Sequence, residues 1–286
     1  MDCSILSNRL QITRVKNTFS KASPINKGIV QGSGIGPTLF SIMISDLKCL
    51  SSINDLFKYA DDTTMLSPEN TDVDFLTEFL HIQDWAVKNK MVINMEKTKE
   101  LVFRRPNPRC FICPAPIVNI VQVSEIKLLG VLFSSNFKFD SHVKFLLSQC
   151  NQRSYLLRQL HSQGLSSRYV HIVFDAIVIS RFLYALSVWG GFLSSELVGQ
   201  INSFFKRMFR YGHSKKLFDF NDLLVHSDYR LFSKMQISSH CMHQVLPCQR
   251  SSLVDLRSRG HPYMLPTVSS TAHKKSFVIR CLYDFI

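Results

Sequence analysis

Hydrophobic and polar positions follow two different periodicities along the chain, and the change from one to the other divides it. Up to about residue 140, short apolar runs are separated by turn-forming residues. One of them, QGSGIGPTLF (31–40), predicts a glycine-rich loop that leads into a helix with Pro37 in its first turn. Another, FKYADDTTML (57–66), predicts a β-hairpin around the adjacent residues Asp61 and Asp62.

The same portion contains one longer helical pattern and several strand patterns. Apolar side chains recur at helical spacing over 71–89, and Thr71 is the expected N-cap. Strands are expected over 91–94 and 100–104, and two more in the run IVQVSEIKLLGVLFS (120–134). Residues 1–140 are therefore expected to form a small antiparallel sheet with helices.

From Ser141 onward the pattern becomes helical. Apolar side chains recur at helical spacing at Val143, Leu146, Leu147, Cys150, Leu157 and Leu160. Further helices are expected over 165–190 and 195–211, and 213–286 is expected to be mainly helical. The pattern predicts an α+β fold in three parts: a mixed portion (1–140), a helical portion (141–212) and a helical C-terminal region (213–286).

The distribution of charge adds a candidate partner. The chain has 34 Lys and Arg against 21 Asp and Glu, a formal net charge of +13. Ten basic and two acidic residues fall between 141 and 216, a net of +8. This local excess favours a nucleic-acid-binding surface over the alternative, a generally basic soluble protein. Lys206, Arg207 and Arg210 are the candidate phosphate contacts.

The first residues and the cysteines bear on location. MDCSILSNRLQ lacks the basic and apolar regions of a signal peptide, so the eight cysteines are expected to be reduced thiols in an intracellular, nuclear or cytoplasmic, protein. Residues 170–191 are apolar enough for a membrane span, but His171, Asp175 and Arg181 interrupt them. Charges are costly in mid-bilayer, so we expect a buried soluble helix and no membrane partner.

Asp61 and Asp62 are the first candidate for chemistry. Two carboxylates about 5 Å apart repel by roughly 3 kcal/mol at an effective dielectric near 20. A divalent cation turns that repulsion into attraction, and Mg²⁺ prefers such hard oxygen ligands together with substrate phosphates. The alternative is a turn without a metal, because aspartate side chains cap nearby amides. Taken alone, an Asp-Asp pair favours the turn.

Other candidate sites are weaker. Cys110 and Cys113 form a CxxC pair without a second pair at zinc-ribbon spacing, so two unrelated thiols are favoured. The run SHCMHQVLPC (239–248) contains His240, Cys241, His243 and Cys248 in an order that favours a helix and its end over a zinc knuckle. Four aromatic residues could stack on bases, but their helical context favours the core: Trp189, Phe204, Phe205 and Phe209.

Several motifs in one order carry a resemblance to a known family. YADD (59–62), which follows QGSGIGPTLF, resembles the palm of reverse transcriptases, above all those of non-LTR (LINE-like) retrotransposons. LSNRLQITRVKNTFS (6–20) resembles the stretch before the glycine-rich loop. KNKMVINMEKTKELVF (88–103) and EIKLLGVLFSSNFKFDSHV (125–143) resemble the blocks that follow the catalytic hairpin. LRSRGHPYMLP and KKSFVIRCLYDF resemble the tail after the thumb.

The resemblance implies an RNA-directed DNA polymerase, a nucleotidyltransferase with RNA template, DNA primer and dNTP as partners and Mg²⁺ (or Mn²⁺) as cofactor. Residues 1–140 would be a partial palm with the primer-grip hairpin, and 141–212 a basic thumb. Asp61 and Asp62 would be catalytic metal ligands, and Lys97 would sit near the triphosphate. The implied substrate contacts are Gln31, Gly32, Tyr59, Leu129 and Gly130.

One part of the family's catalytic shell is not found. The third carboxylate lies in a strand upstream of the glycine-rich loop, and the only acidic residue before Gln31 is Asp2, which lacks that context. We therefore expect a partial reverse transcriptase without the fingers and the first catalytic motif, whose activity on its own is doubtful. The alternative is a non-catalytic nucleic-acid-binding remnant or domesticated fragment.

Overall fold

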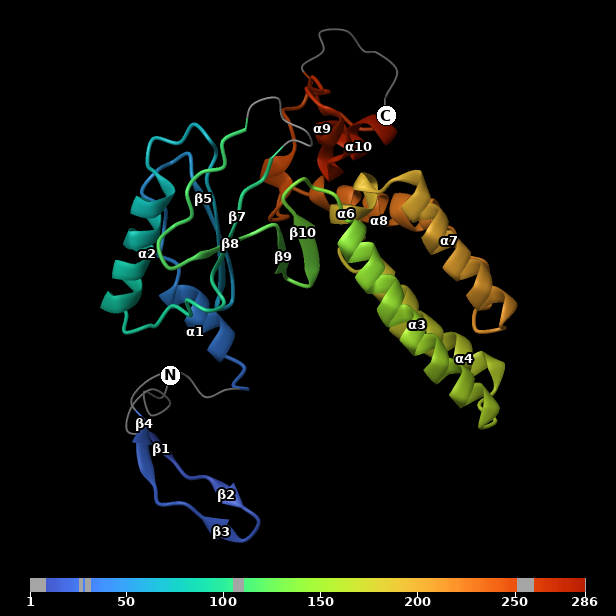
Figure 1. Ribbon diagram of the computed structural model, residues 1–286, viewed down its shortest axis with the longest axis horizontal. Helices are drawn as coiled ribbons and strands as arrows, with labels where there is room; N and C mark the ends of the chain where they lie inside the picture. The colour runs from blue at the N-terminus through green and yellow to red at the C-terminus, as the bar shows by residue number, and fades with distance from the viewer. Residues whose placement is uncertain (1–8, 26–27, 29–31, 105–110, 251–259, 286) are drawn as a thin grey trace. The chain divides into compact units, whose positions relative to one another are not determined.

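The computed structural model describes residues 9–25, 28, 32–104, 111–250 and 260–285 (Figure 1). The chain divides into two compact units, Met1–Thr98 and Lys99–Ile286. The fold is α+β, with small sheets and many helices, as the hydrophobic pattern predicts. Among the described residues the strands form five separate two-stranded pairs, four of them antiparallel and one parallel, instead of one small antiparallel sheet. The division into three parts at residues 140 and 212 stays a prediction.

The first unit begins with strands that pair within residues 9–25. Strand β1 (Arg9–Gln11) pairs with β4 (Ser23–Ile25), and β2 (Arg14–Val15) pairs with β3 (Thr18–Phe19). Helix α1 (Gly36–Met43) follows the glycine-rich loop and carries Pro37 in its first turn, as expected. Strands β5 (Asp55–Tyr59) and β6 (Asp62–Leu66) form the predicted hairpin.

Helix α2 (Phe75–Lys88) closes the first unit, and its start differs from the prediction. The N-cap is Asp74, whose carboxylate accepts the Thr77 N–H at 2.7 Å, and not Thr71. The Thr71 hydroxyl instead donates to Asn54 Oδ1 at 2.8 Å. An aspartate one position before the first apolar helical residue is an equally good cap, and the tertiary bond to Asn54 decides between the two candidates.

A buried carboxylate fastens α2 to the loop before β5. Glu78 is fully buried, and its oxygens accept the Leu50 N–H (2.9 Å), the Ser51 N–H (2.8 Å) and the Asn54 side-chain amide (2.9 Å). Burial raises the pKa of Glu78, but these three hydrogen bonds outweigh it and hold the pKa below its ordinary value. Glu78 is therefore a structural anion in the first unit.

The second unit starts with short strands. Strand β7 (Lys99–Leu101) pairs in parallel with β8 (Val121–Val123), and β9 (Glu125–Leu128) forms a hairpin with β10 (Val131–Ser134). The prediction of a strand over 91–94 is wrong, because Asn94 begins a turn instead. The strand predicted over 100–104 is shorter, and the run 120–134 holds three strands where two were expected.

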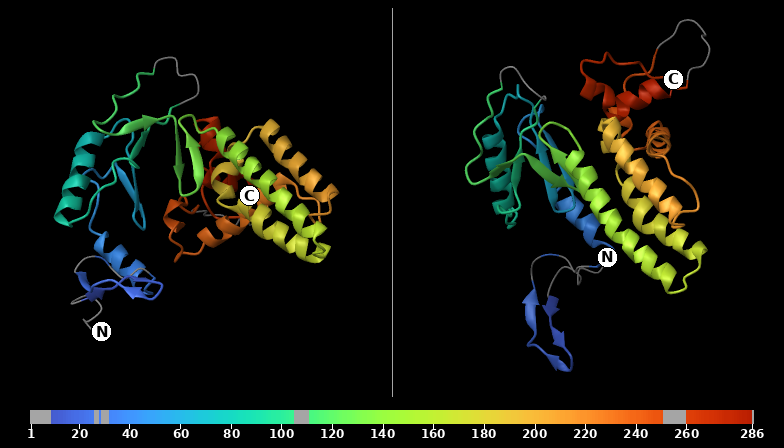
Figure 2. Two further views of the ribbon diagram at one scale, coloured as in Figure 1. Left: turned by 60° about the horizontal axis from the view of Figure 1, so that its bottom comes forward. Right: turned by 45° about the vertical axis from the view of Figure 1, so that its right-hand side comes forward.

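Helices make up the rest of this unit: α3 (Asp140–Ser162), α4 (Ser167–Phe174), α5 (Ser180–Leu183), α6 (Leu186–Trp189), α7 (Ser195–Arg210), α8 (Phe220–Met235), α9 (Thr271–Lys275) and α10 (Phe277–Asp284). Helices α3, α4 and α7 lie side by side (Figures 1 and 2). Their facing sides bury one hydrophobic core that includes Trp189, Phe174, Phe182, Phe204 and Phe205. The aromatic residues for which base stacking was the alternative are thus core residues, except Phe209, which is exposed.

The stretch Ser167–Phe192 is long and apolar enough to cross a membrane by length and composition alone. It is not one regular helix. Residues Asp175–Ile179 between α4 and α5 are π-helical, and the chain breaks after α5, where Ala185 has a φ of +50°. Its apolar side includes Val170, Phe174 and Phe182, which are fully buried against the neighbouring helices.

The C-terminal helices pack on a second, smaller core. Phe232 on α8 packs with Tyr263 and with Ile279 and Leu282 on α10. Beside this core, the Arg280 guanidinium donates to Asp228 Oδ2 at 2.8 Å and to the Ser187 carbonyl at 3.1 Å. The ion pair therefore joins α10 to α8 and to α6.

Candidate functional site

The two candidate catalytic carboxylates lie at the tip of the β5–β6 hairpin. Tyr59 pairs with Asp62, so Ala60 and Asp61 form a two-residue turn. Ala60 has a φ of +52°, a left-handed conformation that costs a residue with a Cβ atom about 1–2 kcal/mol. Asp61 and Asp62 are both exposed. A strained turn with two solvent-facing carboxylates is an arrangement that clusters at functional sites.

One face of the hairpin is open. In an antiparallel pair, residues directly opposite share a face, so Tyr59 and Asp62 lie on the same side as Phe57 and Thr64. Tyr59 is 67% exposed and Phe57 is 56% exposed. Asp62 is therefore presented on a surface with two accessible aromatic rings.

The other face is fastened to α1 by a residue that the sequence pattern did not single out. Lys58 Nζ donates to the carbonyls of Ile44 and Leu47, each at 2.8 Å, at the end of α1. Ile44 is the C-cap of α1, so its carbonyl is at the end where a helix leaves acceptors unsatisfied, and a lysine there also suits the helix dipole. Leu47 lies beyond the helix. A cavity of about 320 Å³ lies beside Lys58 and Ala60 and reaches Ser41 on α1. In the sequence, the one feature that could have drawn attention to Lys58 is a lysine between the aromatic residues Phe57 and Tyr59.

Lys97 is presented by a turn that Asn94 organises. The Asn94 side chain accepts the Lys97 N–H at 3.1 Å, and its carbonyl accepts the Thr98 hydroxyl at 2.9 Å. Lys97 itself is exposed. The three residues that carry part of the family resemblance therefore build one local structure.

The glycine-rich loop is described only in part. Gly32 has a φ of +86° and nothing lies within 4 Å of the place a Cβ atom would take, so its backbone conformation is what favours glycine. Gln31 lies outside the described residues. The predicted role of both residues in binding template or nucleotide stays a prediction.

Leu129 and Gly130 form the turn of the β9–β10 hairpin, with φ values of +45° and +87°. Two positive φ angles match the twist of a two-residue hairpin. The Tyr184 hydroxyl, from the end of α5, donates to the Leu129 carbonyl at 2.7 Å. A Cβ atom on Gly130 would lie 3.2 Å from the Tyr184 ring, so this residue also fits closely against the turn.

Tyr184 is held in place by the helix break. The Trp189 indole N–H donates to its carbonyl at 3.1 Å, and the left-handed Ala185 follows it directly. A second contact supports the same hairpin: His142 Nδ1 accepts the Leu132 N–H at 3.4 Å. Burial, and next the charge of Lys127, lowers the pKa of His142 to about 4, so its ring is neutral and can accept. The sequence pattern gave no signal for Tyr184, because its partner is 55 residues away.

The basic candidates lie on α7. Lys206 and Arg210 are exposed, as phosphate contacts require. The Arg207 guanidinium lies 5.5 Å from the centre of the Phe204 ring and also donates to Asn151 on α3. These residues and the β9–β10 turn belong to the second unit, and the aspartate hairpin and Lys97 belong to the first.

Three of the Cys and His candidates have other partners in the described residues, and the thiols of Cys241 and Cys248 are free and exposed. His243 Nδ1 bonds to the Met235 carbonyl at 2.9 Å, and His240 Nδ1 accepts the Met242 N–H at 3.2 Å. Cys110 lies outside the described residues, and the Cys113 thiol donates to Gln122. Within the ranges that the structure describes, no three His, Cys, Asp or Glu side chains gather where they could hold a metal ion.

Comparison with known proteins adds the family. The family model "Reverse transcriptase (RNA-dependent DNA polymerase)" matches residues 2–133, which contain the aspartate hairpin, Lys97 and the β9–β10 turn. Residues 2–133 carry a partial reverse transcriptase domain of the retrotransposon type. No solved structure matches it.

The curated relatives of this partial reverse transcriptase are proteins of mobile elements. The probable RNA-directed DNA polymerase from transposon BS of Drosophila melanogaster is 27% identical over 65% of the chain and 22% of its own length. The RNA-directed DNA polymerase from mobile element jockey of Drosophila funebris is 29% identical over 58% of the chain and 20% of its own length. The probable RNA-directed DNA polymerase from transposon X-element of Drosophila melanogaster is 24% identical over 91% of the chain and 30% of its own length. The chain thus spans between 20% and 30% of the length of these relatives.

Proposed function

We propose that the chain contributes the palm and thumb of an enzyme that synthesises DNA on an RNA template by two-metal nucleotidyl transfer. The observation that carries this proposal is the exposed Asp61–Asp62 pair on the strained turn of the β5–β6 hairpin, inside the segment that matches the reverse transcriptase family. Residues 1–140 are assigned to the palm and primer grip, 141–212 to the thumb and 213–286 to a helical C-terminal region.

The carboxylates fit one side of a magnesium site. Their four oxygens are the hard ligands that Mg²⁺ or Mn²⁺ prefers, and both side chains are exposed to an incoming nucleotide. When bound, two such ions stabilise the attacking and leaving oxygens of an in-line phosphoryl transfer. In the described part of the chain no third carboxylate joins this pair. Nucleotide phosphates would supply further ligands, and the third carboxylate of the family would have to come from outside this sequence.

The remaining residues bind and orient the substrates. Lys97 presents a positive charge and a donor for the triphosphate, where it balances the charge that develops on the leaving pyrophosphate. Tyr59, Gly32 and the residue before it in sequence, Gln31, are assigned to contact the nucleotide or the template. Leu129 and Gly130 position the primer terminus. Lys206, Arg207 and Arg210 contact the phosphate backbone without reading sequence.

The test is Mg²⁺-dependent incorporation of dNTP into a DNA primer on an RNA template by the full chain. Asp61→Asn keeps the size of the side chain and removes the charge, so incorporation should fall at least 100-fold because metal positioning supplies most of the catalysis. The matched control is Asp84→Asn, an exposed aspartate of α2 in the same unit, which should leave incorporation unchanged. Equal incorporation by Asp61→Asn and the parent chain would refute the proposal.

A second function is favoured by one observation, the lack of a third metal-binding side chain beside Asp61 and Asp62 in the described ranges. A chain without that ligand could persist as a non-catalytic nucleic-acid-binding protein that uses the basic residues of 141–216. Its signature would be affinity for nucleic acid that falls steeply with salt, without any dNTP incorporation by folded protein. Incorporation that depends on Asp61 would exclude this reading.

A further inference from the structure

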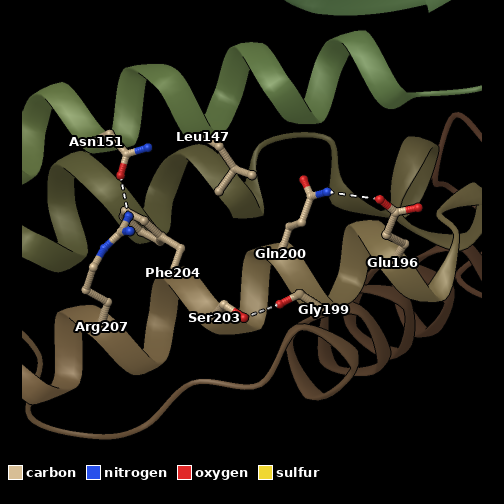
Figure 3. A pocket seen from close by; sticks show the side chains of 8 residues that line it. All are labelled: Leu147, Asn151, Glu196, Gly199, Gln200, Ser203, Phe204 and Arg207. Carbon is tan, nitrogen blue, oxygen red and sulfur yellow. Dashed lines mark hydrogen bonds between the residues drawn. The ribbon is translucent and has the colours of Figure 1, made fainter.

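A groove runs between α3 and α7, and Arg207 is the one residue lining it to which the proposed polymerase function gives a role (Figure 3). Its volume is about 480 Å³. Leu147 on α3 and the buried Phe204 on α7 form an apolar floor, as both residues line the groove with little of their surface exposed. Asn151 on α3 and Gln200 and Arg207 on α7 supply polar groups along it. An apolar floor between hydrogen-bonding side chains suits a flat, polar-edged ligand.

The groove is kept open by a glycine that the chain's own packing does not need. Gly199 lies in the middle of α7, where glycine is the least favourable residue after proline. Nothing lies within 4 Å of the place a Cβ atom on Gly199 would take, and its φ angle lies outside the left-handed region. Because Gly199 has no side chain, the space beside this turn of α7 stays empty, and a ligand can approach the helix backbone closely there.

The polar groups retain hydrogen-bonding capacity. Asn151 accepts from Arg207 through Oδ1, which leaves its amide donors for a ligand. Gln200 donates to Glu196 at 3.5 Å, at the limit of a hydrogen bond, so this contact is readily exchanged. The Ser203 hydroxyl donates to the Gly199 carbonyl at 2.7 Å and keeps its oxygen lone pairs. The groove therefore offers both donors and acceptors, which the edge of a nucleobase requires.

We propose that this groove binds a base of single-stranded nucleic acid, an interaction that goes beyond the proposed polymerase function and does not depend on it. Charge identifies the partner: the groove lies in the part of the chain that holds ten basic and two acidic residues, and Lys206 and Arg210 flank Arg207 on α7. Arg207, held over the Phe204 ring, contacts the adjoining phosphate. A duplex hides the faces and the Watson–Crick edges of its bases, so the strand must be single.

The experiment measures binding of the full chain to fluorescently labelled single-stranded RNA by anisotropy at several salt concentrations. The comparison ligand is a strand of the same length whose central residues are abasic, which keeps the phosphates and removes the bases. Gly199→Leu fills the groove, and the space around the Cβ position predicts that the helix accepts it without loss of thermal stability. The matched control is Gln152→Leu, which adds the same side chain at an exposed position of α3 outside the groove.

We expect the parent chain to bind the abasic strand about tenfold more weakly than the RNA, since one seated base contributes about that much. Gly199→Leu should lose the same factor for RNA, with an unchanged salt dependence and no change for the abasic strand. Gln152→Leu should match the parent. Lys206→Gln should instead reduce the salt dependence, because it removes a phosphate contact.

Three results would overturn the proposal. The first is equal affinity of the parent for RNA and the abasic strand. The second is unchanged RNA binding by folded Gly199→Leu, which would leave a solvated groove or a site for a protein partner. The third is a loss in Gly199→Leu that is equal for both strands. Because the readout is binding, failure of dNTP incorporation in the same preparation would count against the polymerase function alone.

Discussion

Replacement of Glu78 tests how the first unit is held together. Its carboxylate accepts three buried hydrogen bonds, from Leu50, Ser51 and Asn54. A hydrogen bond to a charged group contributes about 1.5–3 kcal/mol, so the loss of three in Glu78→Ala should lower the free energy of unfolding of this unit by at least about 4.5 kcal/mol. Glu78→Gln keeps one acceptor but turns its amide N–H₂ toward a backbone donor. We expect this variant to lose about 2 kcal/mol.

The same carboxylate predicts a dependence on pH. The pKa of Glu78 is lower in the folded chain than its ordinary value, so folding favours the ionised form. Its contribution is therefore complete above the ordinary carboxyl pKa and is lost as the pH falls through the lower, folded pKa. In Glu78→Gln this group no longer titrates, so its share of the acid sensitivity should disappear.

Hydrogen exchange measured by mass spectrometry at increasing urea reports the two units separately. Peptides that contain residues 47–54 should lose protection at lower urea in both variants, while peptides from α3 and α7 should be unchanged. Glu69→Gln, at an exposed position of the same unit, is the matched control and should stay within about 0.5 kcal/mol of the parent. The account of Glu78 would be wrong if Glu78→Gln were as stable as Glu69→Gln. It would also be wrong if the stability of these two variants fell equally as the pH is lowered.

Two further predictions concern the second unit. Tyr184→Phe removes the hydroxyl that donates to the Leu129 carbonyl, so amide hydrogen exchange at 129–131 should become about fivefold faster, equivalent to roughly 1 kcal/mol. The control Tyr169→Phe changes an exposed tyrosine of α4 and should leave this exchange unchanged. Equal exchange rates in the two variants would contradict the contact. Asp228→Ala leaves the Arg280 guanidinium, which is 12% exposed, without its anion, so the free energy of unfolding in urea should fall by about 3 kcal/mol or more. The control Arg230→Ala changes an exposed residue of α8 and should have little effect. A loss below about 1 kcal/mol in Asp228→Ala would show that Arg280 does not need Asp228.

Local patterns predicted the parts of the fold that depend on neighbouring residues. The β5–β6 hairpin, the start of α1 at Pro37 and the long helices α3 and α7 follow from turn chemistry and periodicity over a few residues. The candidate site was visible for the same reason, since Asp61, Asp62 and Lys97 are presented by local turns. The family resemblance then gave these residues their roles.

The features that the sequence did not predict depend on contacts between residues that are far apart in the chain. The cap of α2 depends on Asn54, which engages Thr71 and leaves Asp74 to begin the helix. The helix expected over 165–190 breaks at Tyr184, where the Trp189 indole and the Leu129 carbonyl supply partners from elsewhere. The role of Lys58 could not be predicted either, because nothing in the sequence indicates that a lysine in a strand donates to the carbonyls of Ile44 and Leu47. Each of these needs three-dimensional proximity that periodicity does not encode.

The parallel pairing of β7 with β8 has a consequence for the order in which the chain folds. The β5–β6 and β9–β10 hairpins join adjacent segments, and such hairpins close in about 1–10 μs. Strand β7 instead pairs Lys99 with Val121, so the intervening segment must be synthesised first. At about 5–20 residues per second, β7 remains without its partner for roughly one to four seconds during translation. It is then an unpaired strand that directly follows the first unit in the sequence, and the segment of the nascent chain on which a chaperone would act.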